Sequence, residues 1–155
     1  MATFSVSVVL DKAEVILQDT THIRWPVAEL IDWLNDGQRE IVAFRPDAFN
    51  KTSIVTFASG TKQSLPADGY QLINVVRNMG SGGATPGTAI RKVPQELLDA
   101  QVPNWHASTA SATPLHYMYD LRTPRVYYVY PPVTGTVQVE IVYSAAPTIL
   151  TQTTD

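Results

Sequence analysis

The stretch that most constrains the fold of this chain is residues 24–50, RWPVAELIDWLNDGQREIVAFRPDAFN. Apolar side chains recur in it every three or four residues, and Gln38 is the only polar residue on their line. These side chains are Val27, Leu30, Ile31, Leu34, Ile41 and Val42. Such a period predicts an amphipathic helix of about four turns whose apolar face lies in the core. Pro26 suits the first turn of this helix, and Pro46 ends the pattern.

The opposite side of the predicted helix is acidic. It carries an acidic stripe that consists of Glu29, Asp32, Asp36 and Glu40. Carboxylates spaced along a straight helix diverge too far for all of them to close around one divalent cation. The commonest meaning of such a stripe is a solvated face. A third alternative is that the stripe faces a lumen or the arginines of a neighbouring subunit, which are Arg24, Arg39 and Arg45.

Trp33, Gly37 and Phe44 lie between the apolar and the acidic faces. A glycine in a helix interior costs about 1 kcal/mol relative to alanine, so we expect a neighbour to approach closely at Gly37. Charged residues make up only 16% of the chain, which also contains seven Tyr and three Trp. Because this charge content is low for a soluble domain, we expect other molecules to cover much of the surface. We therefore predict that these three residues belong to an interface.

The segments on either side of this helix have different sequence patterns, helical before it and β-prone after it. Residues 6–18 carry valines and isoleucines at a spacing that fits a second helix, so residues 1–50 are predicted to form an antiparallel helical hairpin. After Pro46, short β-prone runs alternate with turn residues. The first predicted strands are residues 53–58, 63–65, 70–78 and 89–92, and a short helix at residues 94–100 follows.

Three further strands are predicted at residues 115–120, 125–130 and 136–143. Short turns join them, which predicts an antiparallel meander. In the last strand Val139 and Ile141 alternate with polar residues, so one of its faces is expected to be buried and the other wet. The middle strand is apolar on both sides and is expected to be covered on both. The Pro-Ala-Asp-Gly turn at residues 66–69 predicts a positive φ at Gly69.

Residues 144–155, SAAPTILTQTTD, carry no charge until Asp155 and follow no period. Pro147 interrupts continuation of the preceding strand because it cannot donate to a ladder. Beyond it, Ile149 and Leu150 are apolar anchors of a β-prone segment that suits an arm docked on a partner's sheet edge. The alternative is a frayed chain end. The prediction is an α+β protein with one domain over residues 1–155: a helical hairpin packed against an antiparallel β-sheet region with long loops (51–143), and an extended C-terminal arm (144–155).

Composition and motifs argue against most classes of chemistry. Eleven basic and fourteen acidic residues give a net charge of −3, and there is no basic patch for a dedicated nucleic-acid reader. The chain has no cysteine and three well-separated histidines, so neither a metal site nor a cofactor is predicted. The Gly-rich loop at residues 80–87 lacks the Lys-Ser/Thr that ends a phosphate-binding loop. No local signature of an enzyme, a signal peptide or a transmembrane segment is present, so we expect a soluble intracellular protein without catalytic activity.

Several segments resemble one protein family. They are LQD at residues 17–19, RWP at 24–26, WLNDGQREIV at 33–42, RPDA at 45–48, QSLP at 63–66, RN at 77–78, LD at 98–99, WH at 105–106, VYPP at 129–132 and IVY at 141–143. In this order they resemble the head-to-tail adaptor (connector) protein family of tailed bacteriophages over nearly the whole chain. The segments at residues 33–42 and 45–48 are the most specific of these.

The resemblance implies a structural virion protein in the neck of the particle, made in the host cytoplasm. Such adaptors form a ring, usually of about twelve subunits, between the portal and the tail or nozzle protein, and double-stranded DNA passes through the lumen without sequence-specific binding. The resemblance transfers no catalytic residue. Members of the family often continue into further C-terminal helices, so here either neighbouring subunits or a shortened form is expected to supply the cover of the helical hairpin. The alternative function is a tail-associated module whose Tyr-rich sheet binds a glycan or a receptor.

Overall fold

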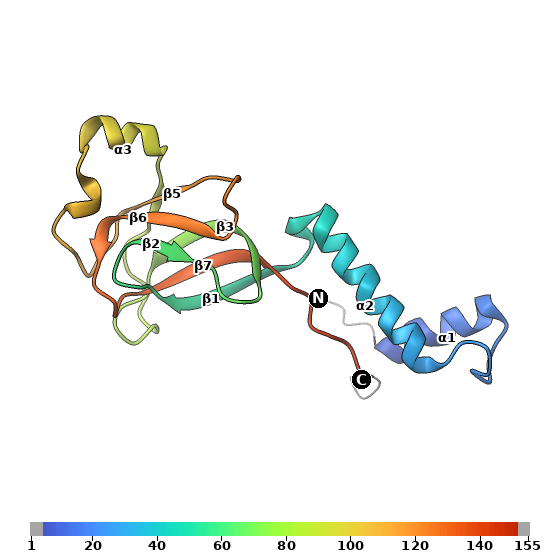
Figure 1. Cartoon of the computed structure of the whole chain (residues 1–155). Coiled ribbons are helices and arrows are strands. Elements are labelled where there is room, and N and C mark those ends of the chain that lie inside the picture. The colour runs from blue at the N-terminus through green and yellow to red at the C-terminus, as the bar shows by residue number, and fades with distance from the viewer. Residues whose placement is uncertain (1–4, 152–155) are drawn as a thin grey trace. The chain divides into compact units, whose positions relative to one another are not determined.

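The computed structural model describes residues 5–151 of the chain. Two N-terminal helices precede the strands, and a third helix lies between strands, so the predicted α+β class is confirmed (Figure 1). The chain divides into two compact units. The helical unit comprises Met1–Arg45 and Pro147–Asp155, and the β unit comprises Pro46–Ala146. The single domain over residues 1–155 and the packing of the hairpin on the sheet region stay predictions.

The first helix of the helical unit, α1, spans Val6–Leu17, as the sequence predicted. The Ser5 side chain caps it by accepting a hydrogen bond from the backbone N–H of Ser7 at 3.2 Å. At the other end Gln18 adopts a left-handed conformation and its N–H donates to the carbonyl of Glu14. Of the residues in α1, only Val6 is buried, so this helix packs little of its apolar surface against the described residues.

The connection from α1 to the second helix is organised by Asp19. Its carboxylate accepts hydrogen bonds from three successive backbone N–H groups, those of Ile23, Arg24 and Trp25, at 3.2, 2.8 and 2.8 Å. These donors favour the charged form, so the hydrogen bond from Trp25 above all lowers the pKa of Asp19. The chain reverses here and enters α2 (Figure 1).

Helix α2 spans Val27–Phe44, which confirms the predicted helix. Its buried side chains are Leu30, Ile31, Asn35 and Val42. The expectation that Ile41 lies in the core is wrong, because its side chain is 58% exposed. Asn35 takes the buried place instead, about 120° around the helix axis from Ile41. The reason is that the C-terminal segment binds to the Asn35 side of the helix, which turns the buried face away from Ile41.

The β unit begins with a short 3-10 helix, η1, at Pro46–Ala48 and contains two sheets. The first sheet is antiparallel and has the order β1-β7-β3. Its strands are β1 (Asn50–Thr56), β7 (Gln138–Ala145) and β3 (Gly69–Asn78). The second sheet has the order β2-β6-β5-β4, with β4 parallel to β5 and the other pairs antiparallel. Its strands are β2 (Gly60–Ser64), β6 (Val126–Val133), β5 (His116–Tyr119) and β4 (Arg91–Lys92).

The predicted meander of the last three strands is wrong in its final step. Strands β5 and β6 do pair antiparallel, with Tyr117 opposite Val129. Strand β7, however, lies in the other sheet between β1 and β3. Because β2 and β5 occupy both edges of β6, no edge of β6 is left for β7. Val133, read from the sequence as part of a turn, belongs to β6.

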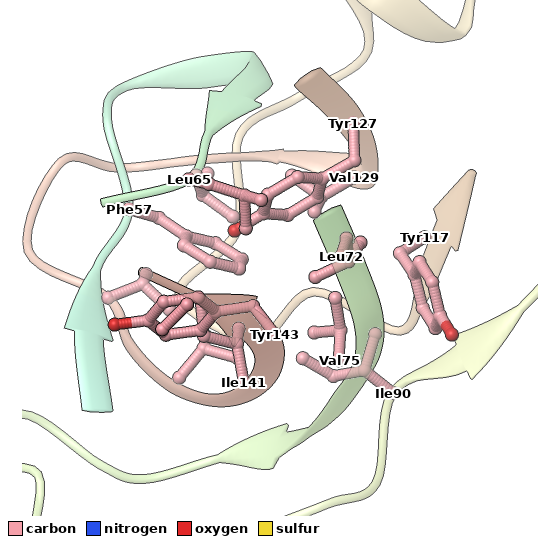
Figure 2. Packing of buried hydrophobic residues seen from close by; sticks show 14 residues of the cluster. Phe57, Leu65, Leu72, Val75, Ile90, Tyr117, Tyr127, Val129, Ile141 and Tyr143 are labelled. Atoms are coloured by element: carbon pink, nitrogen blue, oxygen red, sulfur yellow. The ribbon is translucent and has the colours of Figure 1, made fainter. Parts of the chain in front are cut away.

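The core of the β unit lies between the inner faces of the two sheets (Figure 2). The Phe57 and Tyr127 rings meet edge to face at 6.0 Å between centroids. Val139 and Ile141 of β7 are fully buried, whereas Gln138 and Glu140 between them are half-buried. The predicted alternation of β7 between a buried and a wetter face is therefore confirmed.

The outer face of β6 is covered by a second, smaller cluster. Helix α3 (Gln95–Gln101) and the 3-10 helix η2 (Trp105–Ala107) contribute its buried residues Leu98 and Trp105. The Trp105 indole N–H donates to Asp99 at 2.6 Å, which satisfies its only polar group. Tyr128 of β6 packs against this cluster. The prediction that the middle strand is covered on both sides is confirmed.

Gly69 is required for space rather than for a positive φ. Its N–H donates to the Pro66 carbonyl at 2.9 Å, so the predicted turn is present. Its φ is not positive, and the prediction on that point is wrong. A Cβ at this position would lie 3.0 Å from Leu65 Cβ and 3.1 Å from the Tyr143 ring. The turn is pressed against the core, and this contact selects glycine.

The same turn is tied to the first sheet by a polar network. The Lys51 ammonium of β1 lies 2.7 Å from an Asp68 oxygen, and the Tyr143 hydroxyl donates to the same carboxylate at 3.1 Å. The hydrogen bond from Lys51 is the main reason that the pKa of Asp68 is lowered. Three segments far apart in sequence are joined in this way.

We expect Asp68→Asn to reduce the free energy of unfolding at neutral pH. The free energy of unfolding of the variant should also change less than that of the wild type as the pH falls. A carboxylate with a depressed folded-state pKa contributes stability above its unfolded pKa of about 3.9 and loses it as the pH falls through the lower folded value. The difference between wild type and variant should therefore shrink as the pH drops from 6 toward about 2. Denaturant titrations across this range measure it, and a difference that stays constant with pH contradicts the assignment.

We expect Tyr127→Phe to stabilise the protein by about 1 kcal/mol, because the buried Tyr127 hydroxyl has no hydrogen-bond partner among the described residues. Tyr117→Phe is the matched control, since its hydroxyl donates to Asn74 Oδ1 at 2.9 Å and its loss should destabilise. Denaturant titration of both variants measures the change in the free energy of unfolding, which should be a gain for Tyr127→Phe and a loss for Tyr117→Phe. Equal losses in both would show that the Tyr127 hydroxyl is satisfied.

Candidate assembly interface

The residues Trp33, Gly37 and Phe44, called here the aromatic stripe, follow one line along α2. They lie four and seven positions apart, which places them on the same side of a helix. Trp33 is 47% exposed and Phe44 is 79% exposed. Apart from its own helix backbone and chain neighbours, no atom of the described residues lies within 4 Å of a Cβ built on Gly37. The described residues 5–151 therefore leave this stripe open.

Trp33 is held in place from the connection that precedes α2. Its ring lies 5.1 Å from the Trp25 ring, tilted by 59°. The Arg24 guanidinium lies over the Trp25 ring, 5.6 Å from the centroid of that ring. Asp19 in turn holds the backbone of Arg24 and Trp25, because its carboxylate accepts hydrogen bonds from both of their N–H groups. An aromatic side chain that is ordered before binding loses less conformational entropy when a partner covers it.

Further apolar side chains of the helical unit are also exposed. They are Val8, Val9, Val15, Ile16, Leu17, Ile23, Ile41 and Ile149. Ile16 is 80% exposed. Scattered exposed apolar residues are normal on a protein surface, but a whole helix with a single buried residue is not. These side chains and the aromatic stripe together form the candidate interface.

All four members of the acidic stripe are exposed: Glu29, Asp32, Asp36 and Glu40. Asp36 pairs with Arg39 of the same helix at 2.8 Å, and both side chains are largely solvated. Among the described residues there is no group of three or more His, Cys, Asp or Glu side chains arranged to hold a metal ion. The structure thus places the stripe on an open face of α2, next to the aromatic stripe.

The C-terminal segment is bound to α2 through Asn35. The Asn35 Nδ2 donates to the Leu150 carbonyl at 3.1 Å, and the Leu150 N–H donates to Asn35 Oδ1 at 2.8 Å. Ile149 is 63% exposed beside this contact. The predicted arm starts too early, because Ser144 and Ala145 belong to β7 and are fully buried. Residues 152–155 of the predicted arm lie outside the described residues.

Sequence reasoning missed Asn35 as a structural residue. It lies four residues after Ile31 and seven before Val42, so its helical spacing places it at the edge of the predicted apolar line, next to these two residues. Its role depends on Leu150, 115 positions away, and no local pattern announces that partner. Asp19 was likewise overlooked, although an Asp followed by two threonines is a familiar turn signal.

The Gly-rich loop at residues 80–87 contains no Lys or Arg. It lines a hollow of about 440 Å³ together with residues of β7 and the segment before β5. Its polar lining is made of amides and hydroxyls, among them Asn78, Thr85 and Gln138, and no Lys or Arg of the described chain lines it. Among the helices of residues 5–151, none is long and apolar enough to cross a membrane.

Comparison with protein families places the chain. The model of a family described as SU10 adaptor protein matches residues 5–155. A search of curated proteins finds no match. The family match covers almost the whole chain and confirms the resemblance carried by the segments around α2. The chain therefore belongs to the SU10 adaptor family, a family of phage head-to-tail adaptors, and is a structural protein of the bacteriophage virion.

Proposed function

We propose that this adaptor forms a closed ring in the neck of the virion, between the portal and the tail or nozzle protein, with double-stranded DNA passing through its lumen. About twelve copies is the number that the family resemblance favours. The chain is made in the host cytoplasm before it joins the particle. Its role is structural rather than enzymatic. The observation that carries the proposal is the apolar surface that the helical unit leaves exposed.

The exposed surface of α1 calls for cover from another chain. The helix has 12 residues and buries only Val6. An isolated helix of roughly 12 residues is marginal in water, because nucleation is costly and packing usually supplies most of the stability. A ring repeats one head-to-tail contact around a closed circle, so each subunit covers its neighbour and no copy keeps an open face. The aromatic stripe of α2 supplies anchors for such a contact.

The acidic stripe suits a lumen through which DNA must move. Its carboxylates are exposed, and Asp36 pairs with the half-exposed Arg39 of the same helix. Basic side chains would bind DNA phosphates and release counterions, which slows passage. Acidic side chains repel the phosphates, so DNA moves past without adhering. The net charge of −3 is consistent with this role.

The glycan-binding alternative has weaker support. A stacking platform needs aromatic faces open to solvent. In the described part of the chain, Tyr117, Tyr127 and Tyr143 are buried in the core, and Tyr128 and Tyr130 pack against the smaller cluster around Trp105. These tyrosines therefore serve packing. Tyr70 of β3 is 47% exposed and offers one open ring, which is not a platform.

We expect Gly37→Leu to block ring formation while leaving the subunit folded. None of the described residues crowds this position, and leucine has the higher helix propensity, so the melting temperature should hold or rise. Mass photometry should show closed particles for wild type, at a multiple of the 17.0 kDa chain, and subunits for the variant. The matched control is Ala43→Leu, another exposed position of α2, which should still assemble. Normal rings with leucine at position 37 would place the interface elsewhere.

We expect neutralisation of the acidic stripe to spare folding and to change DNA behaviour. Replacing Glu29 and Glu40 by Gln, and Asp32 and Asp36 by Asn, removes like charges along one helix face, so stability should hold or rise slightly. If the stripe lines the lumen, the altered rings should retain DNA more strongly at low salt. Co-sedimentation of rings with linear DNA at two salt concentrations measures this. Equal retention by both rings would place the stripe outside the lumen.

A further inference from the structure

Asn35 is the buried polar residue of α2. Both its side-chain nitrogen and its side-chain oxygen form hydrogen bonds with the backbone of Leu150. The side chain is 6% exposed. Its N–H donates to the Leu150 carbonyl and its oxygen accepts from the Leu150 N–H, at 3.1 and 2.8 Å. This pair of hydrogen bonds is the pattern that one strand residue makes with another in an antiparallel ladder. The carboxamide therefore acts as a one-residue strand partner for the C-terminal segment.

A contact of this kind recognises main chain and not side chain. Any extended residue presents the same N–H and carbonyl, so Asn35 does not distinguish the arm of its own chain from the arm of another copy. A buried amide without partners is costly, so the site favours an occupant at all times. The site is, in this sense, a clamp for an extended segment.

From these contacts we infer that in the assembled ring the Asn35 clamp holds the C-terminal segment of a neighbouring copy. The inference rests on the ring proposed above and names the contact that links its subunits. An exchanged arm makes the same hydrogen bonds as the chain's own arm, so exchange loses no contact. The occupant is the part of Pro147–Asp155 around Leu150.

The exposure of apolar side chains around the clamp favours a neighbouring copy over the chain's own arm. The clamp and its occupant are separated in sequence by the whole β unit, between Arg45 and Pro147, which permits an exchange of arms. With the chain's own arm in place, Ile149 is still 63% exposed and Ile41 of α2 is 58% exposed. Own-chain binding therefore satisfies the amide without burying these apolar side chains, and contact with a second subunit is the way to cover them.

The test uses the absence of cysteine from the chain. Gln38→Cys, one turn beyond Asn35, and Ile149→Cys, beside Leu150, are introduced together and bridged with a short bismaleimide. Rings are assembled from equal amounts of isotopically heavy and light subunits. The masses of the cross-linked peptides are then measured by mass spectrometry. Exchange predicts that about half of the bridged pairs combine a heavy and a light chain, because each clamp draws its arm from a random neighbour. Unassembled subunits should give unmixed pairs only.

The outcomes separate this inference from the ring itself. Rings that yield only unmixed pairs, or no bridged pairs, overturn the exchange and leave the ring intact. Subunits that never form a closed particle, measured by mass, overturn both. Adding Asn35→Ala to the cysteine pair should lower the bridging yield about tenfold, whereas Ala43→Ser on another side of α2 should not change it. The isotope measurement keeps Asn35, so it decides the question even if the Asn35→Ala chain folds poorly.

Discussion

Pairing of β6 and β7 along both of their edges is the constraint on which the β unit depends. Strand β6 lies between β2 and β5, and β7 lies between β1 and β3. Each is thus the centre of its own sheet, and their inward side chains, among them Tyr127 and Ile141, meet in one core (Figure 2). The Gly69 turn packs against Tyr143 of β7, and the Lys51–Asp68–Tyr143 network ties this turn to β1 and β7.

The helical unit follows a different principle. It has strong local order, with a capped α1, a connection held by Asp19 and an arm bound through Asn35. It buries few apolar side chains, however, and leaves aromatic and aliphatic residues of both helices in solvent. A chain that combines a well-packed β core with a helical unit whose apolar faces are open is expected of a subunit that completes its packing in an assembly. This agrees with membership in a phage adaptor family.

The sequence by itself determined the features that depend on neighbouring residues. The 3.6-residue period located α2, the two-residue alternation identified the buried face of β7, and the segments around α2 carried the family resemblance. These are reliable because helix and strand geometry repeats locally, so a pattern of side chains reports directly on which face is apolar.

Only the tertiary structure decided which distant segments meet. The partner of β7 depended on β2 and β5 having taken both edges of β6, and the buried side of α2 depended on Leu150 binding to Asn35. Gly69 proved necessary because Tyr143, far along the chain, lies against it. In each case the deciding energy comes from a contact between residues far apart in sequence, and local periodicity carries no information about such pairs.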